Sequence, residues 1–255
     1  MSYLFVLSVS VLLYSCKNEN GIPPTIVDSV QHTTTPGSIG QIPLPAGFKR
    51  VADHPASFAA WLRGLILKQD KTVYLYNGLP KKNQLAQYAV LQMPRSNTDL
   101  QQCADVVMRL RAEYLFHSER YDEILFTDFG GRQYAWTYKN DRTAFELYLN
   151  KVFGFCGSAS LENQLSTVTD FSSIQPGDVL IRGGFPGHAV IVADLAVNDE
   201  GEKIFLLVQG YQPAQDLHVL VNPVDKVVSP WYKVSSSDTI YTPEWVFYRS
   251  QLRRW

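Results

Sequence analysis

The sequence predicts an α+β fold in which helices pack on an antiparallel sheet. Helical patterns come mostly first along the chain, and strand patterns separated by turn residues come mostly after them. This segregation of helices and strands is typical of the α+β class. The chain has 255 residues, of which 45% are hydrophobic, so it can build one good core and requires no second domain.

The first half of the folded region is expected to hold most of the helices. The expected helices are 56–67, 99–116, 142–153 and 159–165, and the expected strands there are 72–76, 88–93, 123–126 and 132–138. Residues 96–99 open the longest helix, whose apolar positions recur every three or four residues. Its polar face carries Asp105, Arg109 and Glu113 at i, i+4 spacing.

The second half is expected to form the sheet, with strands at 179–181, 188–194, 203–209 and 217–221. A glycine-rich loop ending at Gly187 delivers His188 to the mouth of a strand, and on alternation His188, Val190, Val192 and Asp194 share one face. The hairpin turn at 198–201 would bring Gln209 back beside His188. A histidine paired with an amide suits a general base and the group that orients it.

The chain begins with an apolar segment at residues 3–13, which has signal-peptide length and is too short for a stable membrane span. It ends in Leu13-Tyr14-Ser15-Cys16, which resembles a bacterial lipobox. We therefore expect residues 1–16 to be a lipoprotein signal peptide with Cys16 as the lipidated residue. The protein would be lipid-anchored in the cell envelope, in the outer membrane of a Gram-negative bacterium. An ordinary cleaved signal peptide and a buried strand are the alternatives.

Composition bounds the remaining organisation. Residues 17–45 are rich in Thr, Pro, Gly, Ser and Asn, so we expect a flexible tether, followed by a single α+β domain at 46–255. The formal net charge of −1 gives no reason to expect nucleic acid as a partner. No set of His, Cys, Asp or Glu has metal-ligand spacing, and no phosphate loop or dinucleotide motif is present. We therefore expect neither a metal nor a cofactor.

Two cysteines remain as candidate nucleophiles once Cys16 is assigned to lipid. Cys103 lies in the first or second turn of the longest helix, with ample chain before His188 to build a helical half. Its position on the apolar stripe is also that of a small core residue. Cys156 lies in Cys156-Gly157-Ser158 ahead of a short helix, but little chain separates it from His188. A disulfide between the two cysteines, which an oxidising envelope permits, is a further alternative.

Part of the second half resembles the NlpC/P60-type papain-like amidases. The resemblance rests on Gln175-Pro176-Gly177-Asp178, on Gly187-His188-Ala189, and on a hairpin that ends in the polar residue Gln209. It implies a papain-like fold, with His188 as the catalytic histidine and Gln209 as the third polar residue. The Asp-Cys-Ser-Gly sequence that surrounds the nucleophile in that family is absent here.

A second resemblance spans nearly the whole mature chain. The blocks Asp99-Leu100-Gln101-Gln102-Cys103-Ala104-Asp105, Pro186-Gly187-His188-Ala189, Pro230-Trp231-Tyr232 and Thr242-Pro243-Glu244-Trp245 are similar to a bacterial lipoprotein family, domain of unknown function 4846. This resemblance implies an envelope lipoprotein without a known activity. Because the Gln-Cys-Ala-Asp block belongs to the pattern of that family, Cys103 ranks ahead of Cys156.

Two functional hypotheses follow. The first is a lipid-anchored papain-like cysteine hydrolase acting on an amide, such as a peptidoglycan stem peptide. Cys103 would attack, His188 would act as base and then acid, Gln209 would hold the imidazole, and backbone N–H groups near the helix start would meet the oxyanion, with Gln102 as a further donor. Cys156 is the alternative nucleophile. The second hypothesis is a non-enzymatic binding lipoprotein on the same scaffold.

Overall fold

The computed structural model describes residues 36–255, so the predicted signal peptide with Cys16 and most of the predicted tether lie outside the described residues. Residues 36–45 are not part of a tether, and the folded body begins earlier than the predicted start at residue 46. The 3-10 helix η1 (Ile39–Gln41) packs on the body, and Ile39 and Ile42 are completely buried. The composition of residues 36–45 did not indicate a folded segment because it contains few apolar residues, yet Ile39 and Ile42 are core residues.

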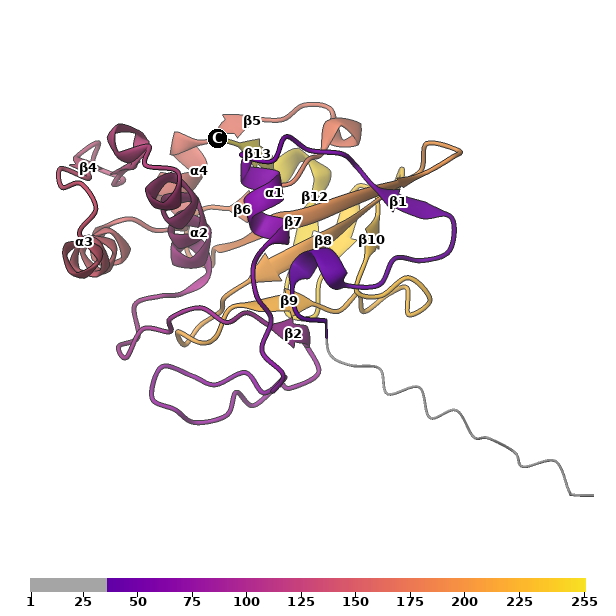
Figure 1. Ribbon diagram of the computed structural model, residues 1–255, viewed down its shortest axis with the longest axis horizontal. Helices are drawn as coiled ribbons and strands as arrows, with labels where there is room; N and C mark the ends of the chain where they lie inside the picture. Colours follow the sequence, from indigo (N-terminus) through magenta and orange to yellow (C-terminus); the bar gives the residue numbers. More distant parts are fainter. Residues whose placement is uncertain (1–35) are drawn as a thin grey trace, which may run out of the picture. The chain divides into compact units, whose positions relative to one another are not determined.

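Nine strands of the described region form one antiparallel sheet (Figure 1). The order β2-β9-β8-β7-β6-β13-β5 describes its main path, while β1 pairs with β7 and β10 pairs with β8. The strands are β1 (Phe48–Arg50), β2 (Gln87–Val90), β5 (Ser166–Thr167), β6 (Val179–Arg182), β7 (His188–Asn198), β8 (Lys203–Gln209), β9 (His218–Leu220), β10 (Tyr232–Lys233) and β13 (Leu252–Arg254). Two separate hairpins are β3 (Leu125–Thr127) with β4 (Gln133–Ala135), and β11 (Thr239–Tyr241) with β12 (Val246–Tyr248).

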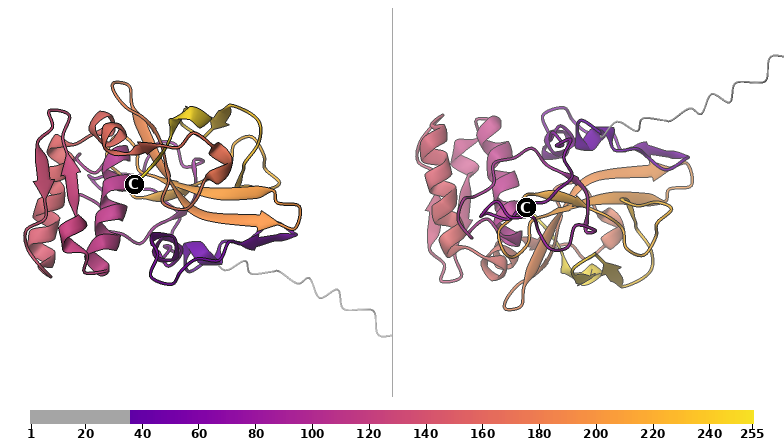
Figure 2. Two further views of the ribbon diagram at one scale, coloured as in Figure 1. Left: turned by 90° about the horizontal axis from the view of Figure 1, so that it is seen from above. Right: turned by 90° about the horizontal axis from the view of Figure 1, so that it is seen from below.

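The helices of the described region are α1 (Phe58–Arg63), α2 (Cys103–His117), α3 (Arg142–Phe155) and α4 (Ser158–Gln164), with short 3-10 turns η2 (Tyr121–Glu123), η3 (Phe171–Ser173) and η4 (Arg249–Gln251). Figure 2 shows α2, α3 and α4 gathered at one end of the body, from which the long strands extend. The α+β class with a large antiparallel sheet is confirmed. Within residues 36–255, no helix combines the length and apolar character that crossing a membrane requires.

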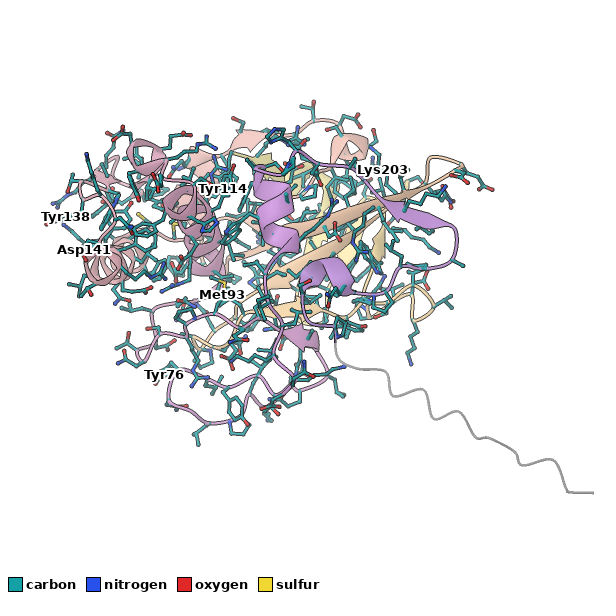
Figure 3. All side chains as sticks on the ribbon, in the orientation of Figure 1. Tyr76, Met93, Tyr114, Tyr138, Asp141 and Lys203 are labelled. Atoms are coloured by element: carbon teal, nitrogen blue, oxygen red, sulfur yellow. The ribbon has the colours of Figure 1, made fainter. Side chains whose placement is uncertain are left out.

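Two hydrophobic clusters lie on opposite faces of the sheet. The larger one joins the helices to β7 residues such as Ala189 and Ile191, and the smaller one holds Val190 and Val192 with residues of η3 and β12. In the larger cluster, Tyr114 of α2 stacks on Phe58 of α1 at 4.9 Å between ring centroids. Figure 3 labels Tyr114 between α2 and α1. Burying large aromatic rings in this way fixes how the helical layer sits on the sheet.

Several predicted elements begin or end elsewhere. Residues 72–76 do not form a strand of the sheet and make only isolated bridges, at Tyr74 and Leu75. The longest helix begins at Cys103 rather than at residue 99. Asp99 lies in the loop before the helix, where its carboxylate accepts hydrogen bonds from Gln102 Nε2 at 3.0 Å and from the Ala214 backbone N–H at 2.6 Å. This interaction ties the loop before α2 to the segment after β8.

The long strand β7 carries a β-bulge that reverses its alternation. The register between β7 and β8 shifts between Val192 and Asp194. A bulge inserts one extra residue, so side chains beyond it exchange faces. The prediction that Asp194 shares a face with His188 is therefore wrong: its carboxylate turns toward the helices and pairs with Arg63 of α1 and with Arg50 of β1.

The Asp194 ion pairs predict a large stability effect. Asp194 is completely buried, and Arg50 Nε lies 2.7 Å from its Oδ2. We expect Asp194→Ala to lower the free energy of unfolding by about 3–5 kcal/mol, because it removes the buried carboxylate that two guanidinium groups share: Arg63 keeps Asp53, but Arg50 keeps only the backbone carbonyl of Ile42. Asp199→Ala is the matched control: it removes the exposed pair with Lys49 and should cost about 1 kcal/mol or less. Urea denaturation measures both, and equal costs would contradict the argument.

Candidate functional site

The start of α2, the α3–α4 connection and the loop before β7 enclose a cavity of about 450 Å³. Cys103, Cys156 and His188 all line it, together with Tyr211 and Trp245. Residues far apart in the sequence therefore meet here because α2 packs with its first turn against the beginning of β7. Both candidate nucleophiles and the candidate base lie at this one cavity.

Cys103 is the first residue of α2 and is 7% exposed. The backbone N–H of Ala189, the residue that follows His188, lies near enough to its thiol to act on the thiol pKa. Burial raises the pKa of this thiol to about 11, and the nearby carboxylate of Asp105 adds to the rise, while the Ala189 N–H opposes it. The thiol is thus held against the strand start and stays protonated at neutral pH.

His188 begins β7 and is 2% exposed. Its Nε2 lies 2.9 Å from Oε1 of Gln209, so the predicted contact between the two residues is present. Phe247, Tyr211 and Trp245 surround the ring, with ring centroids 4.9–5.7 Å away. Burial lowers the pKa of His188 to about 4, and the positive charge of Lys81 acts in the same direction. The imidazole is therefore neutral at neutral pH.

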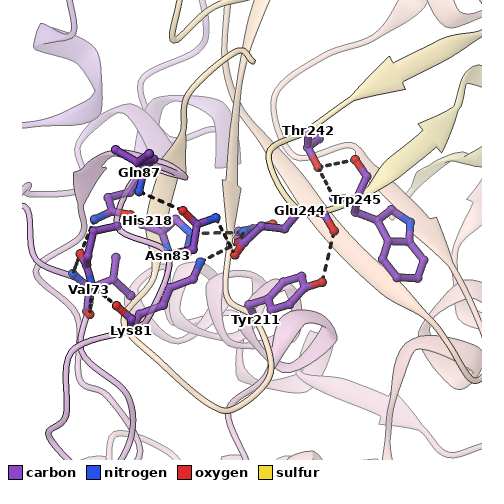
Figure 4. Close-up of polar contacts among 12 residues, drawn as sticks. Val73, Lys81, Asn83, Gln87, Tyr211, His218, Thr242, Glu244 and Trp245 are labelled. Carbon is purple, nitrogen blue, oxygen red and sulfur yellow. Dashed lines mark hydrogen bonds and ion pairs between the residues drawn. The ribbon is translucent and has the colours of Figure 1, made fainter. Parts of the chain in front are cut away.

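The hydrogen bonds behind His188 determine which ring nitrogen carries its proton (Figure 4). His218 Nδ1 lies 2.9 Å from the carbonyl oxygen of Asp216, which only accepts, so Nδ1 donates and Nε2 of His218 is an acceptor. Gln209 Nε2 faces this acceptor at 3.2 Å and also donates to Glu244 Oε2 at 3.0 Å. The amide of Gln209 can donate to both His218 Nε2 and Glu244 Oε2 only if its NH₂ group faces them.

The oxygen of Gln209 consequently points at His188, and His188 must donate to it from Nε2. The lone pair of the neutral imidazole is then on Nδ1. Within residues 36–255, Nδ1 has no hydrogen-bond partner, and His188 borders the cavity that contains the Cys103 thiol. The network thus leaves Nδ1 as the ring nitrogen of His188 that can accept a proton.

A buried ion pair supports the amide from behind. Lys81 Nζ lies 2.6 Å from Glu244 Oε2, and the two side chains are 7% and 12% exposed. Sequence reasoning noted the Glu244 block only as part of a resemblance, and it did not single out Lys81 or connect His218 with the site. No local pattern could have done so, because Lys81 and Glu244 are 163 positions apart in the chain.

Cys156 lines the same cavity, at the carboxyl end of α3. Burial raises the pKa of its thiol to about 12. A helix carboxyl end disfavours a thiolate, whereas the amino end where Cys103 lies favours one. Both thiols are free, so the structure does not contain the disulfide considered as an alternative.

The side chain of Gln102, expected as an oxyanion donor, is already engaged. Its Nε2 donates to Asp99, and its Oε1 accepts from Gln212 Nε2. The backbone N–H groups of the first turn of α2 remain as donors, since no preceding helical carbonyl exists to accept them. Among the described residues, no group of three or more His, Cys, Asp or Glu side chains is arranged to hold a metal ion.

The two buried histidines predict a loss of stability in acid. The pKa of His218 is lowered to about 3 and that of His188 to about 4, both by burial. Between pH 6.5 and 4 the unfolded chain binds protons that the folded chain does not, so stability falls as pH falls. We expect each histidine to contribute about 2 kcal/mol to the loss between pH 7 and pH 4.5.

Urea denaturation at the two pH values measures this loss. His218→Gln keeps one donor and one acceptor and should reduce the loss, whereas replacing the exposed His117 by Gln should leave it unchanged. An identical acid loss in His218→Gln and wild type would show that burial does not keep His218 neutral.

Comparison with protein families gives one match. The model described as domain of unknown function (4846) matches residues 40–142 and 128–254 and so spans nearly all of the described body, including the cavity residues. No curated protein and no solved structure matches the chain. Since the match covers far more than half of the sequence, the chain belongs to the family of domain of unknown function 4846.

Proposed function

We propose that this protein is a lipid-anchored, papain-like cysteine hydrolase that cleaves an amide bond in cell-wall peptides. The observation that carries the proposal is the meeting of three groups. Cys103 at the start of α2 lines the same cavity as His188 at the start of β7, with its thiol near the Ala189 backbone N–H, and His188 is hydrogen-bonded to Gln209 at the end of β8. A nucleophile, a base and an orienting group are the parts that thiol hydrolysis requires.

The order of these groups also supports a papain-like arrangement. A cysteine on a helix comes first in the chain, a histidine at the start of a strand follows, and a polar residue at the end of the partner strand comes last. The helix amino end stabilises developing negative charge on the sulfur, and the strand pair holds the imidazole rigidly. Cys156, at a helix carboxyl end, has neither advantage.

The proposed reaction starts from a neutral thiol and a neutral imidazole. As the Cys103 sulfur attacks the amide carbonyl carbon, Nδ1 of His188 takes the thiol proton, and the imidazolium is stabilised through Nε2 by Gln209. Backbone N–H groups at the start of α2 stabilise the oxyanion. The imidazolium then protonates the leaving amine, and water releases the acyl group from the sulfur with the help of the same base.

Attachment through Cys16 would place this site in the envelope, where peptidoglycan stem peptides supply amide bonds. Three acyl chains would hold the protein on its membrane, since each buried methylene contributes about 0.8 kcal/mol. A cavity of about 450 Å³ is large enough for a short peptide segment. The proposed substrate is therefore a short peptide of the cell wall rather than a folded protein.

One observation favours the second candidate, a binding lipoprotein without catalysis. The pKa of Cys103 is raised to about 11 and that of His188 is lowered to about 4, so the resting pair holds no thiolate. A protein that merely binds peptides needs no thiolate. The two candidates are separated by whether His188 activates Cys103.

We expect iodoacetamide to modify Cys103 at least about tenfold faster than Cys156 at pH 8, because Cys103 lies at the amino end of α2 and near Ala189, the residue that follows the proposed base. His188→Ala should slow modification of Cys103 by about tenfold or more. Mass spectrometry of the peptides that contain each cysteine measures both rates. His117→Ala, at an exposed helix end, is the control and should leave both rates unchanged. Equal rates for Cys103 in wild type and His188→Ala would favour the binding protein.

Cleavage itself is tested with peptidoglycan fragments. Wild type and Cys156→Ser should release products from muropeptides, whereas Cys103→Ser should reduce cleavage at least about a thousandfold, because a protonated hydroxyl is a far weaker nucleophile. Mass spectrometry of the reaction mixture identifies the bond that breaks. Activity that survives in Cys103→Ser but disappears in Cys156→Ser would assign the nucleophile to Cys156.

A further inference from the structure

The carboxyl group of Asp105 lines the cavity, and only one of its two oxygens accepts a hydrogen bond within the described residues. Asp105 is 6% exposed and lines the cavity from the first turn of α2. Its Oδ2 accepts the backbone N–H of Gln102 at 2.9 Å, which is the contact expected for a carboxylate near a helix start. Within the described residues, Oδ1 has no hydrogen-bond partner. Helix capping therefore accounts for one oxygen of this carboxyl and leaves the other free.

No cation of the chain pairs with this carboxyl in residues 36–255. The basic residue one turn further along α2 is Arg109, whose two terminal nitrogens are taken by Glu113 and Glu146, while its Nε has no partner among the described residues. The ionisable side chains that line the cavity carry carboxyl, thiol, imidazole and phenol groups, and none belongs to lysine or arginine. Asp99 also lines the cavity, but one of its oxygens already accepts two hydrogen bonds.

We propose that Asp105 binds a protonated amino group of the ligand, so that the cavity takes a peptide bearing a primary ammonium close to the bond that reacts. That a bond of this ligand reacts rests on the proposed function, but the ammonium subsite itself needs only the cavity and the carboxyl group. A buried carboxylate requires an opposite charge or hydrogen-bond donors, and an ammonium group supplies both. Oδ1 has no partner among the described residues and is not fully buried, so it is the oxygen that such a donor would reach from the cavity.

This subsite would couple ligand binding to the reactivity of Cys103. The Asp105 carboxylate is close enough to raise the pKa of the Cys103 thiol, and burial without a cation raises the pKa of the Asp105 carboxyl itself. An ammonium on Asp105 would favour its carboxylate form and cancel the effect of that charge on the sulfur. The thiol would then be activated mainly when the correct ligand is present.

Charged thiol reagents test the subsite without any enzymatic assay. The reagents are 2-aminoethyl methanethiosulfonate, which is a cation, and 2-sulfonatoethyl methanethiosulfonate, which is an anion. The Cys103 sulfur attacks the sulfenyl sulfur, a disulfide forms and methanesulfinate leaves, so only the carried charge differs. Mass spectrometry measures the rate at Cys103 for each reagent at pH 8 and low ionic strength.

We expect wild type to react faster with the cation than with the anion, relative to the rates of free cysteine. Asp105→Asn keeps an oxygen that can accept from Gln102 and removes the charge, and it should reduce this preference about tenfold. Asp105→Ser is a second neutral acceptor and should do the same. Asp122→Asn makes an equal change of charge outside the cavity and should have no effect.

An unchanged preference in folded Asp105→Asn would overturn the proposal. If neither Asp105 variant folds, wild type alone decides, because the absence of a preference for the cation would also overturn it. The outcome is separate from that of the proposed hydrolase. If the charge preference depends on Asp105 while His188→Ala leaves the Cys103 rate unchanged, the ammonium subsite stands and the catalytic proposal fails.

Discussion

The amide of Gln209 is the group on which the chemistry of the cavity depends. It has one acceptor and two donors, and its surroundings allow only one orientation. Glu244 and the Nε2 lone pair of His218 both require a donor, so the NH₂ group must face them and the oxygen must face His188. Through this one side chain, the Glu244 carboxylate and the backbone carbonyl that His218 contacts determine which ring nitrogen of His188 carries the proton. The donor and acceptor roles in this network are coupled, because none of the hydrogen bonds can be reversed without leaving another group unsatisfied.

The packing of α2 on the sheet is the second constraint. Gly210, which follows β8, lies so close to α2 that a Cβ atom there would be 2.6 Å from Cγ2 of Val106 and 3.2 Å from the carbonyl oxygen of Gln102. The segment that continues from Gln209 therefore touches the helix that begins with Cys103. Backbone proximity of this kind lets a nucleophile on one half of the fold meet a base on the other without long side chains.

The sequence predicted the part of the site that depends on short-range order. The spacing of two apolar strands around a turn places Gln209 near His188, and the hydrogen bond at 2.9 Å is the result. The helix that carries Cys103 was expected, but not its starting residue, because Asp99 is held by Ala214 far along the chain. The bulge at Asp194 was missed for the same reason: arginines of β1 and α1 determine which face its carboxylate takes. Local patterns carry no information about such distant partners.

The electrostatics of the cavity connect these constraints with activity. Burial keeps the thiol and the imidazole neutral, and this neutral pair is stable but unreactive. A permanent thiolate–imidazolium pair in the cavity would carry a desolvation cost. A cavity in which one carboxyl opposes the thiolate can change its reactivity through a single incoming charge. Asp105 lies on the same helix turn as Cys103, so the position of a ligand ammonium and the position of the sulfur are determined by one rigid element. In the proposed function, ligand recognition and thiol activation would therefore occur as one event.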